Sequence, residues 1–431
     1  MLKRTLFIFS LFISIHTFGQ RTNSSPYSFF GIGQQYNSQT VEQASMGGVG
    51  VAFSDAYHLN YLNPAAHSSI RVATYSLGLT VNDLKIKDMS GSQRSTSTNL
   101  SYVNLGFPVG RKAGVAFGLR PNTSVGYSLL NIENDTSGDP IQSTRFYGSG
   151  GTNTLYGAFG MTVFKSLSVG VEGEYVFGKT ENNILSQRAD VHLATKNNEA
   201  TTIRGNGLKV GMLYKSEFEN KLTMTLGASV KLESTFNTTG TEYLYSLSVQ
   251  SSGVEIPRDT LSATNVSGKL TSPLKTSLGI GFGKENKWYA GLDYEFQDAL
   301  RIQNSLLSVN SSYAFDASNR ISIGGFYIPK INSISSYWDR VTYRAGVRFE
   351  DTGLLVKGSS VNEFTNVKDF GISFGVGLPM KDLSNLNFSV EYGKKGTNIN
   401  NLIQENYLNF RLSLSLNAVG NLAWFQKRKI D

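Results

Sequence analysis

The chain has 431 residues, of which 12% are aromatic, only 17% are charged and none is cysteine. The absence of cysteine excludes disulfides, thiol catalysis, cysteine-ligated metal and a lipoprotein anchor, and a charged fraction below the roughly 25% of soluble proteins predicts that part of the surface does not face water. The formal net charge of +8 is spread along the chain apart from one C-terminal run, which argues against nucleic-acid binding.

The first 19 residues have the pattern of a secretory signal peptide. Two basic residues, Lys3 and Arg4, precede an apolar run over residues 5–18, and the small residue Gly19 follows it. The run is too short to span a membrane as a helix, so we expect cleavage before Gln20 and export; a retained N-terminal anchor is the alternative. No later window approaches eighteen uninterrupted apolar residues, so no transmembrane helix is expected.

Residues 44–66, ASMGGVGVAFSDAYHLNYLNPAA, raise the possibility of a glycine-rich phosphate loop. Such a loop needs a preceding strand, a following helix and, for a nucleoside triphosphate, a Gly-Lys-Ser/Thr ending, and this segment has none of them. It belongs to an apolar, non-alternating stretch over residues 20–70, which we expect to fold as a hatch, or plug, inside the structure that follows. The hatch motif residues are Gly47, Gly48, Gly50, Ser54, Asp55, Asn63, Pro64 and Ala65.

Residues 71–417 alternate between apolar and polar residues in segments of about ten residues, which is the period of β-strands with one apolar face. In residues 221–230 (KLTMTLGASV) and 406–417 (NYLNFRLSLSLN) the alternation is complete. Fourteen such strands are expected, and no helical period competes with them. The other twelve segments are 73–81, 99–107, 112–119, 124–132, 154–164, 167–178, 206–215, 276–283, 287–296, 341–349, 370–378 and 385–393.

The polar faces of these strands mix charged residues with glycine, serine and threonine. A soluble β-sandwich also has polar faces, but glycine alternating with large apolar residues is typical of a lumen face opposite a lipid face. The sequence therefore predicts an all-β transmembrane antiparallel barrel of about 14 strands, within a range of 12 to 16. The predicted lumen charges are Glu172, Glu174, Arg344, Arg348 and Arg411. We expect Glu172 or Glu174 to pair with Arg344 or Arg348 and to hold the hatch.

Unequal connections support the same fold, because short periplasmic turns alternate with long outer loops in outer-membrane barrels. Short turns are expected at 108–112 and 283–287. Long loops are expected at 131–152, 179–203, 250–272 and 298–318. Aromatic girdle residues are expected to be Tyr156, Tyr175, Tyr214, Trp288, Tyr294, Tyr343 and Tyr392. A basic tail, residues 418–431 with Lys427, Arg428 and Lys429, follows the last strand.

The hatch sequence resembles that of the FadL-type outer-membrane transporters of hydrophobic compounds. The resemblance rests on Ala44, Gly47, Gly50, Ala52, Ser54, Asp55, Ala56 and Asn63-Pro64-Ala65, and on the later stretches TSPLKTSLGIGFG and KWYAGLDYEFQDA. Segments such as SSPYSFFGIGQ and YWDRVTYRAGVRFEDTGL are similar to a Bacteroidota subgroup of these barrels. One departure is Ala66, where the family usually has glycine after Asn-Pro-Ala.

The resemblance implies passive transport of small hydrophobic molecules, of the long-chain fatty-acid type, across the outer membrane. An apolar pocket would capture such a solute without an energy source, because burial of apolar surface yields roughly 25 cal/mol per Å². Asp55 and Asn63 are expected to pin hatch turns through their side-chain oxygens. The candidate pocket-lining residues are Phe29, Phe30, Met46, Val51 and Phe53.

The alternative function is that of a FadL-like accessory subunit of an outer-membrane secretion or barrel-assembly complex, which docks a protein partner instead of transporting a solute. Long outer loops and the basic tail favour it. In either case the partners include outer-membrane lipid. No catalytic residue, cofactor or metal is expected, because the mature histidines His58, His67 and His192 form no ligand-spaced pair and accompany no recognisable serine motif.

Overall fold

The computed structural model describes residues 23–89, 91–250, 252–303, 312–358, 363–380 and 384–418. The signal peptide predicted for residues 1–19 lies outside these residues, and so does the predicted basic tail beyond Ala418. Within the described ranges, no helix is long and apolar enough to cross a membrane.

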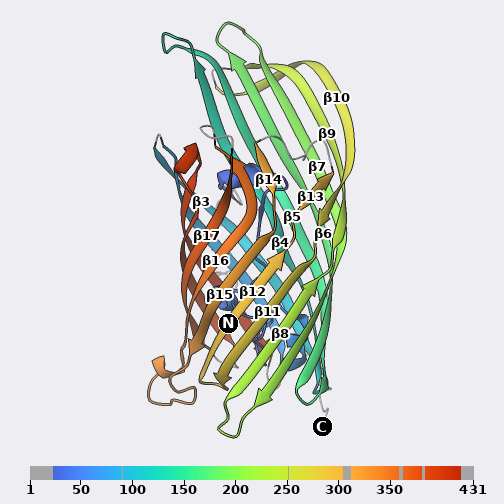
Figure 1. Cartoon of the computed structure of the whole chain (residues 1–431), viewed down its shortest axis with the longest axis vertical. Helices are drawn as coiled ribbons and strands as arrows, with labels where there is room; N and C mark the ends of the chain where they lie inside the picture. Colours follow the sequence, from blue (N-terminus) through green and yellow to red (C-terminus); the bar gives the residue numbers. More distant parts are fainter. Residues whose placement is uncertain are drawn as a thin grey trace, which may run out of the picture.

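In the described residues, fourteen strand crossings form a closed antiparallel barrel (Figure 1). Four crossings are interrupted once, so that β8 continues as β9, β10 as β11, β12 as β13 and β14 as β15. Strand β19 pairs with β2 and closes the barrel. The strands are β2 (Ala73–Lys87), β3 (Ser92–Val109), β4 (Ala113–Asn134), β5 (Pro140–Phe164), β6 (Leu167–Arg188), β7 (Ala194–Glu217), β8 (Thr223–Lys231), β9 (Ser234–Val249), β10 (Glu255–Ser272), β11 (Lys275–Lys284), β12 (Trp288–Gln297), β13 (Arg301–Gln303), β14 (Tyr313–Phe315), β15 (Ser318–Tyr327), β16 (Thr342–Lys357), β17 (Phe364–Pro379), β18 (Asn385–Gly396) and β19 (Gln404–Ala418).

Side chains alternate between the outside and the inside of the barrel wall. On β16, Phe349 is 52% exposed while its neighbour Arg348 is 5% exposed. Apolar side chains face outward along the other strands too, and polar side chains and glycines face the lumen, as a lipid-facing barrel requires. The prediction of a 14-stranded transmembrane barrel is therefore confirmed. One girdle prediction is wrong: Tyr156 is buried in the lumen, because it shares the inward face of β5 with Thr154 and Ala158.

Several stretches predicted to be long loops are strands instead. Residues 131–152 and 179–203 lie mostly in β4, β5, β6 and β7, and residues 250–272 lie mostly in β10. These strands project beyond the rest of the barrel at the end opposite the short turns (Figure 1). Because the outer face of their projecting parts does not contact lipid, their sequence lacks the apolar alternation that marks a membrane strand.

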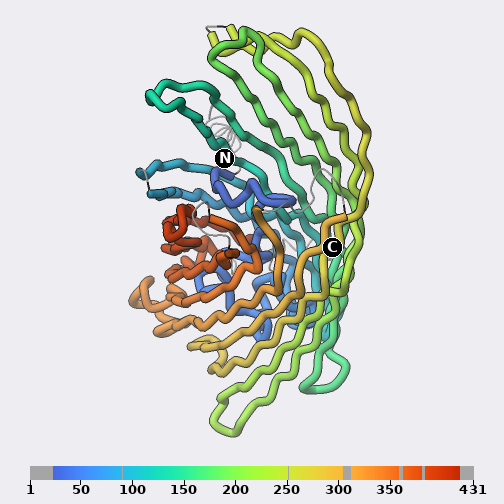
Figure 2. The backbone as a smooth tube through the Cα atoms, turned by 45° about the horizontal axis from the view of Figure 1, so that its top comes forward, coloured from blue at the N-terminus to red at the C-terminus, as the bar shows by residue number. Residues whose placement is uncertain are grey.

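Residues 23–72, which we call the plug segment, lie inside the barrel (Figure 2). They contain only short elements, η1 (Pro26–Phe29), β1 (Gln34–Gln35), α2 (Val41–Ala44) and η2 (Pro64–Ser69). Most of their side chains are buried. Two further single turns, η3 (Trp338–Arg340) and η5 (Ile399–Asn401), lie in the connections between barrel strands.

The ladder between β3 and β4 is incomplete. These strands pair only from Val103↔Leu119 to Val109↔Ala113. Beyond this point residues 92–102 of β3 pair with β2, whereas residues 120–134 of β4 pair with β5 and with the short plug strand β1. We call this unpaired stretch the seam. The hairpin of β2 and β3 and the hairpin of β4 and β5 diverge there (Figure 2).

Candidate functional site

The glycine tract of the plug segment makes a tight turn against the barrel wall. Gly47 and Gly48 have φ of 69° and 90°, a region that residues with a Cβ rarely adopt. A Cβ on Gly47 would lie 2.7 Å from the backbone nitrogen of Val347. The Gly47 amide donates to the Ser373 hydroxyl at 2.8 Å. Glycine is thus required here by conformation and by close packing, and no phosphate-binding geometry is needed to explain it.

A carboxylate of the wall holds the end of this turn. One oxygen of Asp293 on β12 accepts hydrogen bonds from the amides of Gly50 (2.7 Å) and Val51 (2.8 Å). The inner wall contributes glycines where the plug backbone passes, so that added Cβ atoms at Gly346 and Gly227 would overlap the backbones of Met46 and Val51. The plug segment is therefore in direct backbone contact with several strands.

The remaining motif residues fix the turns that the sequence predicted. Asp55 accepts a hydrogen bond from the Tyr57 amide at 2.7 Å, and Asn63 caps η2 by accepting from the Ala65 amide at 3.0 Å. The Asn63 amide also donates to the Met212 carbonyl of β7 at 2.9 Å. Pro64 occupies the first turn of η2, Ala65 is fully buried, and Ser54 is half-buried beside Asp55.

Asn60, which the sequence did not single out, ties the two halves of the motif together. Its carbonyl oxygen accepts from the Leu62 amide at 2.7 Å and from the Gln43 side chain at 2.9 Å. Its amide nitrogen donates to the carbonyls of Gly50 and Phe53, each at 2.7 Å. The Asn-Tyr-Leu-Asn spacing alone could not reveal this role, because the partners lie up to 17 residues away.

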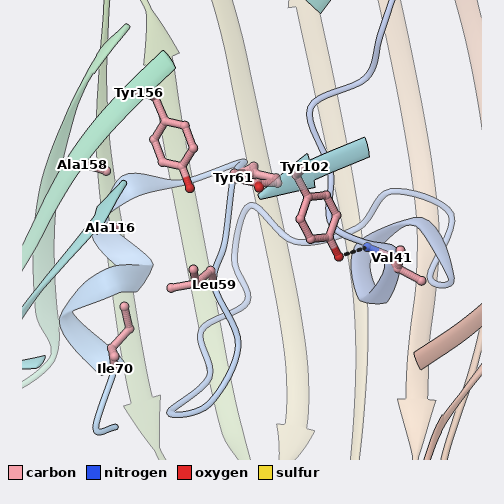
Figure 3. Close-up of a cluster of buried hydrophobic side chains, with 8 residues drawn as sticks. All are labelled: Val41, Leu59, Tyr61, Ile70, Tyr102, Ala116, Tyr156 and Ala158. Carbon is pink, nitrogen blue, oxygen red and sulfur yellow. Dashed lines mark hydrogen bonds between the residues drawn. The ribbon is translucent and has the colours of Figure 1, made fainter. Parts of the chain in front are cut away.

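An aromatic cluster joins the plug segment to the wall (Figure 3). Tyr61 packs edge-on against Tyr102 and Tyr156, with ring centroids 5.6 and 5.5 Å apart. The Tyr102 hydroxyl accepts a hydrogen bond from the Val41 amide at 3.1 Å. The guanidinium of Arg120 lies 4.9 Å from the Tyr61 ring centroid and 4.7 Å from that of Tyr156.

Arg120 also belongs to an ion-pair network of five residues in the lumen. It contacts Glu172 and Glu174, each at 2.7 Å. Lys209 pairs with Glu172 at 2.8 Å, and Lys231 pairs with Glu174 at 2.6 Å. Arg120 was missed by sequence reasoning, although the inward alternation of its strand, read one residue beyond the predicted end at 119, would have placed it on the lumen face.

The expected pairing of Glu172 or Glu174 with Arg344 or Arg348 is wrong. Arg348 instead pairs with Glu391 at 3.1 Å and with two further carboxylates. Arg344 donates to the Asn387 side chain at 3.0 Å.

Arg411 pairs with Glu391 on the same side of the barrel as Arg348. A separate group on the wall joins Glu295 to Lys275 at 2.7 Å and to Arg320 at 3.1 Å. Every carboxylate and cation of these networks lies on a barrel strand, so these ion pairs connect wall strands to one another. The plug segment is held mainly by hydrogen bonds instead.

The five apolar residues expected to line a ligand pocket fall into separate groups. Phe29 and Phe30 pack with Tyr127, Phe146 and Tyr313 near the projecting end. Met46 and Phe53 pack with Tyr289 and Phe326 in a second cluster. Val51 is buried against the wall. The structure therefore does not bring these five side chains together in one cavity.

Cavities lie on both sides of the plug segment. On the side of the projecting strands, three cavities of about 140, 100 and 150 Å³ share Gln35 and Tyr36 and are lined mainly by polar and charged side chains. On the side of the short turns, a cavity of about 470 Å³ is lined by residues such as Phe53, His58 and Ile331. No residue that lines one of the first three also lines the fourth, so the plug segment separates them.

The histidines do not form a metal centre in the described part of the chain, where no group of three or more potential ligands is suitably arranged. His58 lies 3.2 Å from Asp55. His67 is buried in η2, and burial, together with the charges of Lys209 and Arg120, lowers its pKa to about 3, so it is neutral. His192 is exposed in the connection between β6 and β7.

These features define an antiparallel β-barrel of the type that crosses a membrane, with its N-terminal segment folded into the lumen. The model of the protein family described as BamG matches residues 1–431, and the chain belongs to this family. No curated protein sequence matches the chain.

Several solved structures have the same fold at low sequence identity. The CymD monoaromatic hydrocarbon channel is 14% identical with a TM-score of 0.56, over 91% of this chain and 99% of that one. A Pseudomonas aeruginosa FadL homologue is 13% identical, with a TM-score of 0.56 over 90% and 98%. The P. putida toluene transporter TodX is 15% identical, with a TM-score of 0.57 over 89% and 98%. The predicted resemblance to FadL-type barrels is thereby confirmed for the fold.

Proposed function

We propose that this chain is an accessory barrel of an outer-membrane secretion or barrel-assembly complex, in which it docks a protein partner. It would be exported through a cleaved signal peptide and would sit in the outer membrane, with outer-membrane lipid against its apolar belt. The observation that carries this proposal is the separation of the lumen cavities by a plug segment whose backbone contacts the wall.

A passive carrier of hydrophobic molecules needs an apolar path, because burial of apolar surface is its driving force. The cavities on the projecting side are small and lined by groups such as Asn99, Arg120 and Glu391. Such a lining offers an apolar solute little gain and would leave polar groups without partners. The division of the five predicted lining residues into separate groups points the same way.

We also propose that this chain has no enzymatic activity and uses no cofactor. The similar solved structures are described as channels and transporters, not as enzymes. In the described residues, the lumen carboxylates Glu172 and Glu391 are engaged by cations of neighbouring strands. This arrangement suits a wall-stabilising role better than acid–base catalysis.

Isolation of the tagged chain from its own membranes in a mild detergent, followed by mass spectrometry, tests the proposal. We expect a protein partner in a fixed stoichiometric ratio. Recovery of the chain alone, with lipid or detergent held in the lumen, would overturn docking and favour transport. The matched control is the same preparation from cells that produce an unrelated tagged outer-membrane barrel, which removes non-specific binders.

Passive transport of small hydrophobic molecules is the second candidate, and two observations favour it. CymD is described as a monoaromatic hydrocarbon channel and TodX as a toluene transporter, and the seam between β3 and β4 interrupts the wall. Uptake of toluene or of a long-chain fatty acid by cells with and without the chain distinguishes the two candidates. A hatch opening for the ligand would be detected as a loss of uptake when the plug segment is cross-linked to the wall.

A further inference from the structure

The seam leaves one long strand edge without a ladder partner. Residues 92–102 of β3 pair with β2 on one side, and among the described residues no strand pairs with them on the other. A free edge presents a row of backbone donors and acceptors, which natural proteins normally pair, cover or protect with charge. The edge therefore needs a physical explanation.

The facing strand β4 differs from β3, because the plug segment caps part of its edge with hydrogen bonds. The Tyr36 amide donates to the Asn122 carbonyl at 2.9 Å, and the Asn23 side chain donates to the Ser124 carbonyl at 3.2 Å. The Gly126 amide in turn donates to the Ser28 hydroxyl at 3.0 Å. Strand β1 pairs with β4 at Gln34↔Ser124 and Gln35↔Thr123. The seam is thus asymmetric where the plug segment passes it: residues 122–126 of β4 are capped, whereas no described strand pairs with the open edge of β3.

The lumen side of the open edge is mainly polar. Asn99 and Ser101 of β3 line the cavity of about 140 Å³, together with Tyr36 and Asn37 of the plug segment. The Asn99 side chain donates to the Tyr36 hydroxyl at 3.2 Å. A lipid chain or a hydrocarbon cannot satisfy backbone amides or these side chains, whereas an extended polypeptide matches the spacing of such an edge.

The edge also carries a pair of like positive charges near its tip. Arg94 of β3 lies directly opposite Lys85 of β2 in the ladder. Like charges in opposite positions destabilise a strand pair. An acidic side chain on an incoming strand would lie next to Arg94 and relieve this repulsion.

We propose that residues 92–102 of β3 form a strand-addition site for the partner protein, which inserts an extended, polar segment with an acidic residue into the seam. The inference rests on the proposed docking function and specifies its surface. The segment pairs with the β3 edge through main-chain hydrogen bonds and places its polar side chains over the cavity at Asn99. The acidic residue faces Arg94.

Amide hydrogen exchange on the partner complex tests this directly, in comparison with the chain purified alone. We expect residues 92–102 to become protected in the complex, because their free amides acquire acceptors. Strand β18 is the internal control, since β17 and β19 pair with both of its edges, and its exchange should not change. A stoichiometric partner that leaves residues 92–102 unprotected overturns the strand-addition site but leaves docking intact. Absence of any partner overturns both.

Single substitutions provide an independent readout. Successive residues of a strand direct their amides to opposite neighbours, so of Ser95→Pro and Thr96→Pro only one removes an amide from the seam. We expect that variant to assemble as a barrel and to co-purify with roughly tenfold less partner, or still less. Arg94→Glu should weaken recovery as well, and Lys394→Glu on β18 is the matched control.

A photo-crosslinking residue at Thr96, compared with one at Lys394, keeps the test decisive if the proline variants fail to fold. Cross-links from position 96 to one contiguous segment of the stoichiometric partner support the proposal. Cross-links only to lipid, or to a second copy of the chain, overturn it.

Discussion

Asp293 of β12 accepts a hydrogen bond from the backbone amide of Gly50 at 2.7 Å, across a sequence separation of 243 residues. The same carboxylate oxygen accepts a hydrogen bond from the Val51 amide at 2.8 Å. A single wall residue thus satisfies two consecutive amides of the plug segment, which would otherwise be buried without acceptors. This contact makes the position of the glycine turn depend on one carboxylate.

We expect Asp293→Ala to lower the free energy needed to open the plug segment by about 3 kcal/mol. Hydrogen bonds to charged groups contribute roughly 1.5–3 kcal/mol each, and the two amides would lose their acceptor. Asp293→Asn, which keeps an acceptor oxygen, should have a smaller effect. Protease cleavage within residues 23–72, mapped by mass spectrometry, measures the opening. Asp190→Ala in an exposed connection is the control. Equal cleavage in the Asp293→Ala variant and the native chain would contradict the anchoring role.

Gly346→Ala should displace the plug segment, because its Cβ would overlap the carbonyl carbon of Met46. Overpacking of this kind costs about 1–3 kcal/mol. Gly173→Ala is the matched control, since a Cβ there meets no atom within 4 Å. The same cleavage assay should show faster proteolysis of the plug segment for Gly346→Ala and no change for Gly173→Ala. The close-packing interpretation fails if the two variants behave alike.

The membrane-spanning part of the fold could be predicted because lipid on one side and the lumen on the other impose period-two alternation, as in residues 221–230. The same physics explains the errors. Projecting stretches such as residues 179–203 lack lipid against their outer face, so their strands look like loops in the sequence. Tyr156 faces the lumen because strand parity, not aromatic character, decides the direction of a side chain.

The candidate site was predictable in its local parts but not in its long-range contacts. The side chains of Asp55 and Asn63 each accept a hydrogen bond from a backbone amide only two positions further along the chain, and the structure has both turns. The partners of Glu172 were not predictable, because alternation assigns a residue to a face but does not say which strand lies beside it. Arg120 lies 52 residues away from Glu172, and the register of β4, β5 and β6 places the two within reach.

Glu172→Gln should destabilise the barrel by about 3–5 kcal/mol, because it leaves Arg120 and Lys209 buried with one carboxylate fewer. The paired variant Glu172→Gln/Lys209→Met should recover part of this loss by removing the unpaired ammonium. The measurement is the free energy of unfolding in urea for refoldable barrels in detergent micelles. Glu233→Gln disrupts an exposed ion pair with Arg301 and should change the free energy of unfolding by about 1 kcal/mol or less. Similar losses for Glu172→Gln and Glu233→Gln would rule out a buried network at Glu172.

The ion pair of His58 and Asp55 should make the plug segment sensitive to pH in both directions. Burial opposes the charge on His58, but the facing carboxylates of Asp55 and Glu42 outweigh it and raise the pKa of the imidazole above its ordinary 6.5, although Arg344 acts against them. Burial likewise opposes the charge on Asp55, but His58 and the Tyr57 amide lower its pKa below the ordinary 3.8.

The contribution of His58 is complete below pH 6.5 and is lost as the pH rises through its raised pKa. The contribution of Asp55 is complete above pH 3.8 and is lost as the pH falls through its lowered pKa. Protease resistance of the plug segment should therefore be greatest between these two values and should decline on both sides.

In His58→Gln the decline at alkaline pH should disappear, because no imidazolium remains to lose its proton, whereas His192→Gln in an exposed connection should retain it. The measurement is the rate of cleavage within residues 23–72 over roughly pH 3 to 9, with a protease-activity standard at each pH. If the alkaline decline persists unchanged in His58→Gln, another group controls it. The pair would then be a static contact rather than the element that makes the plug segment respond to pH.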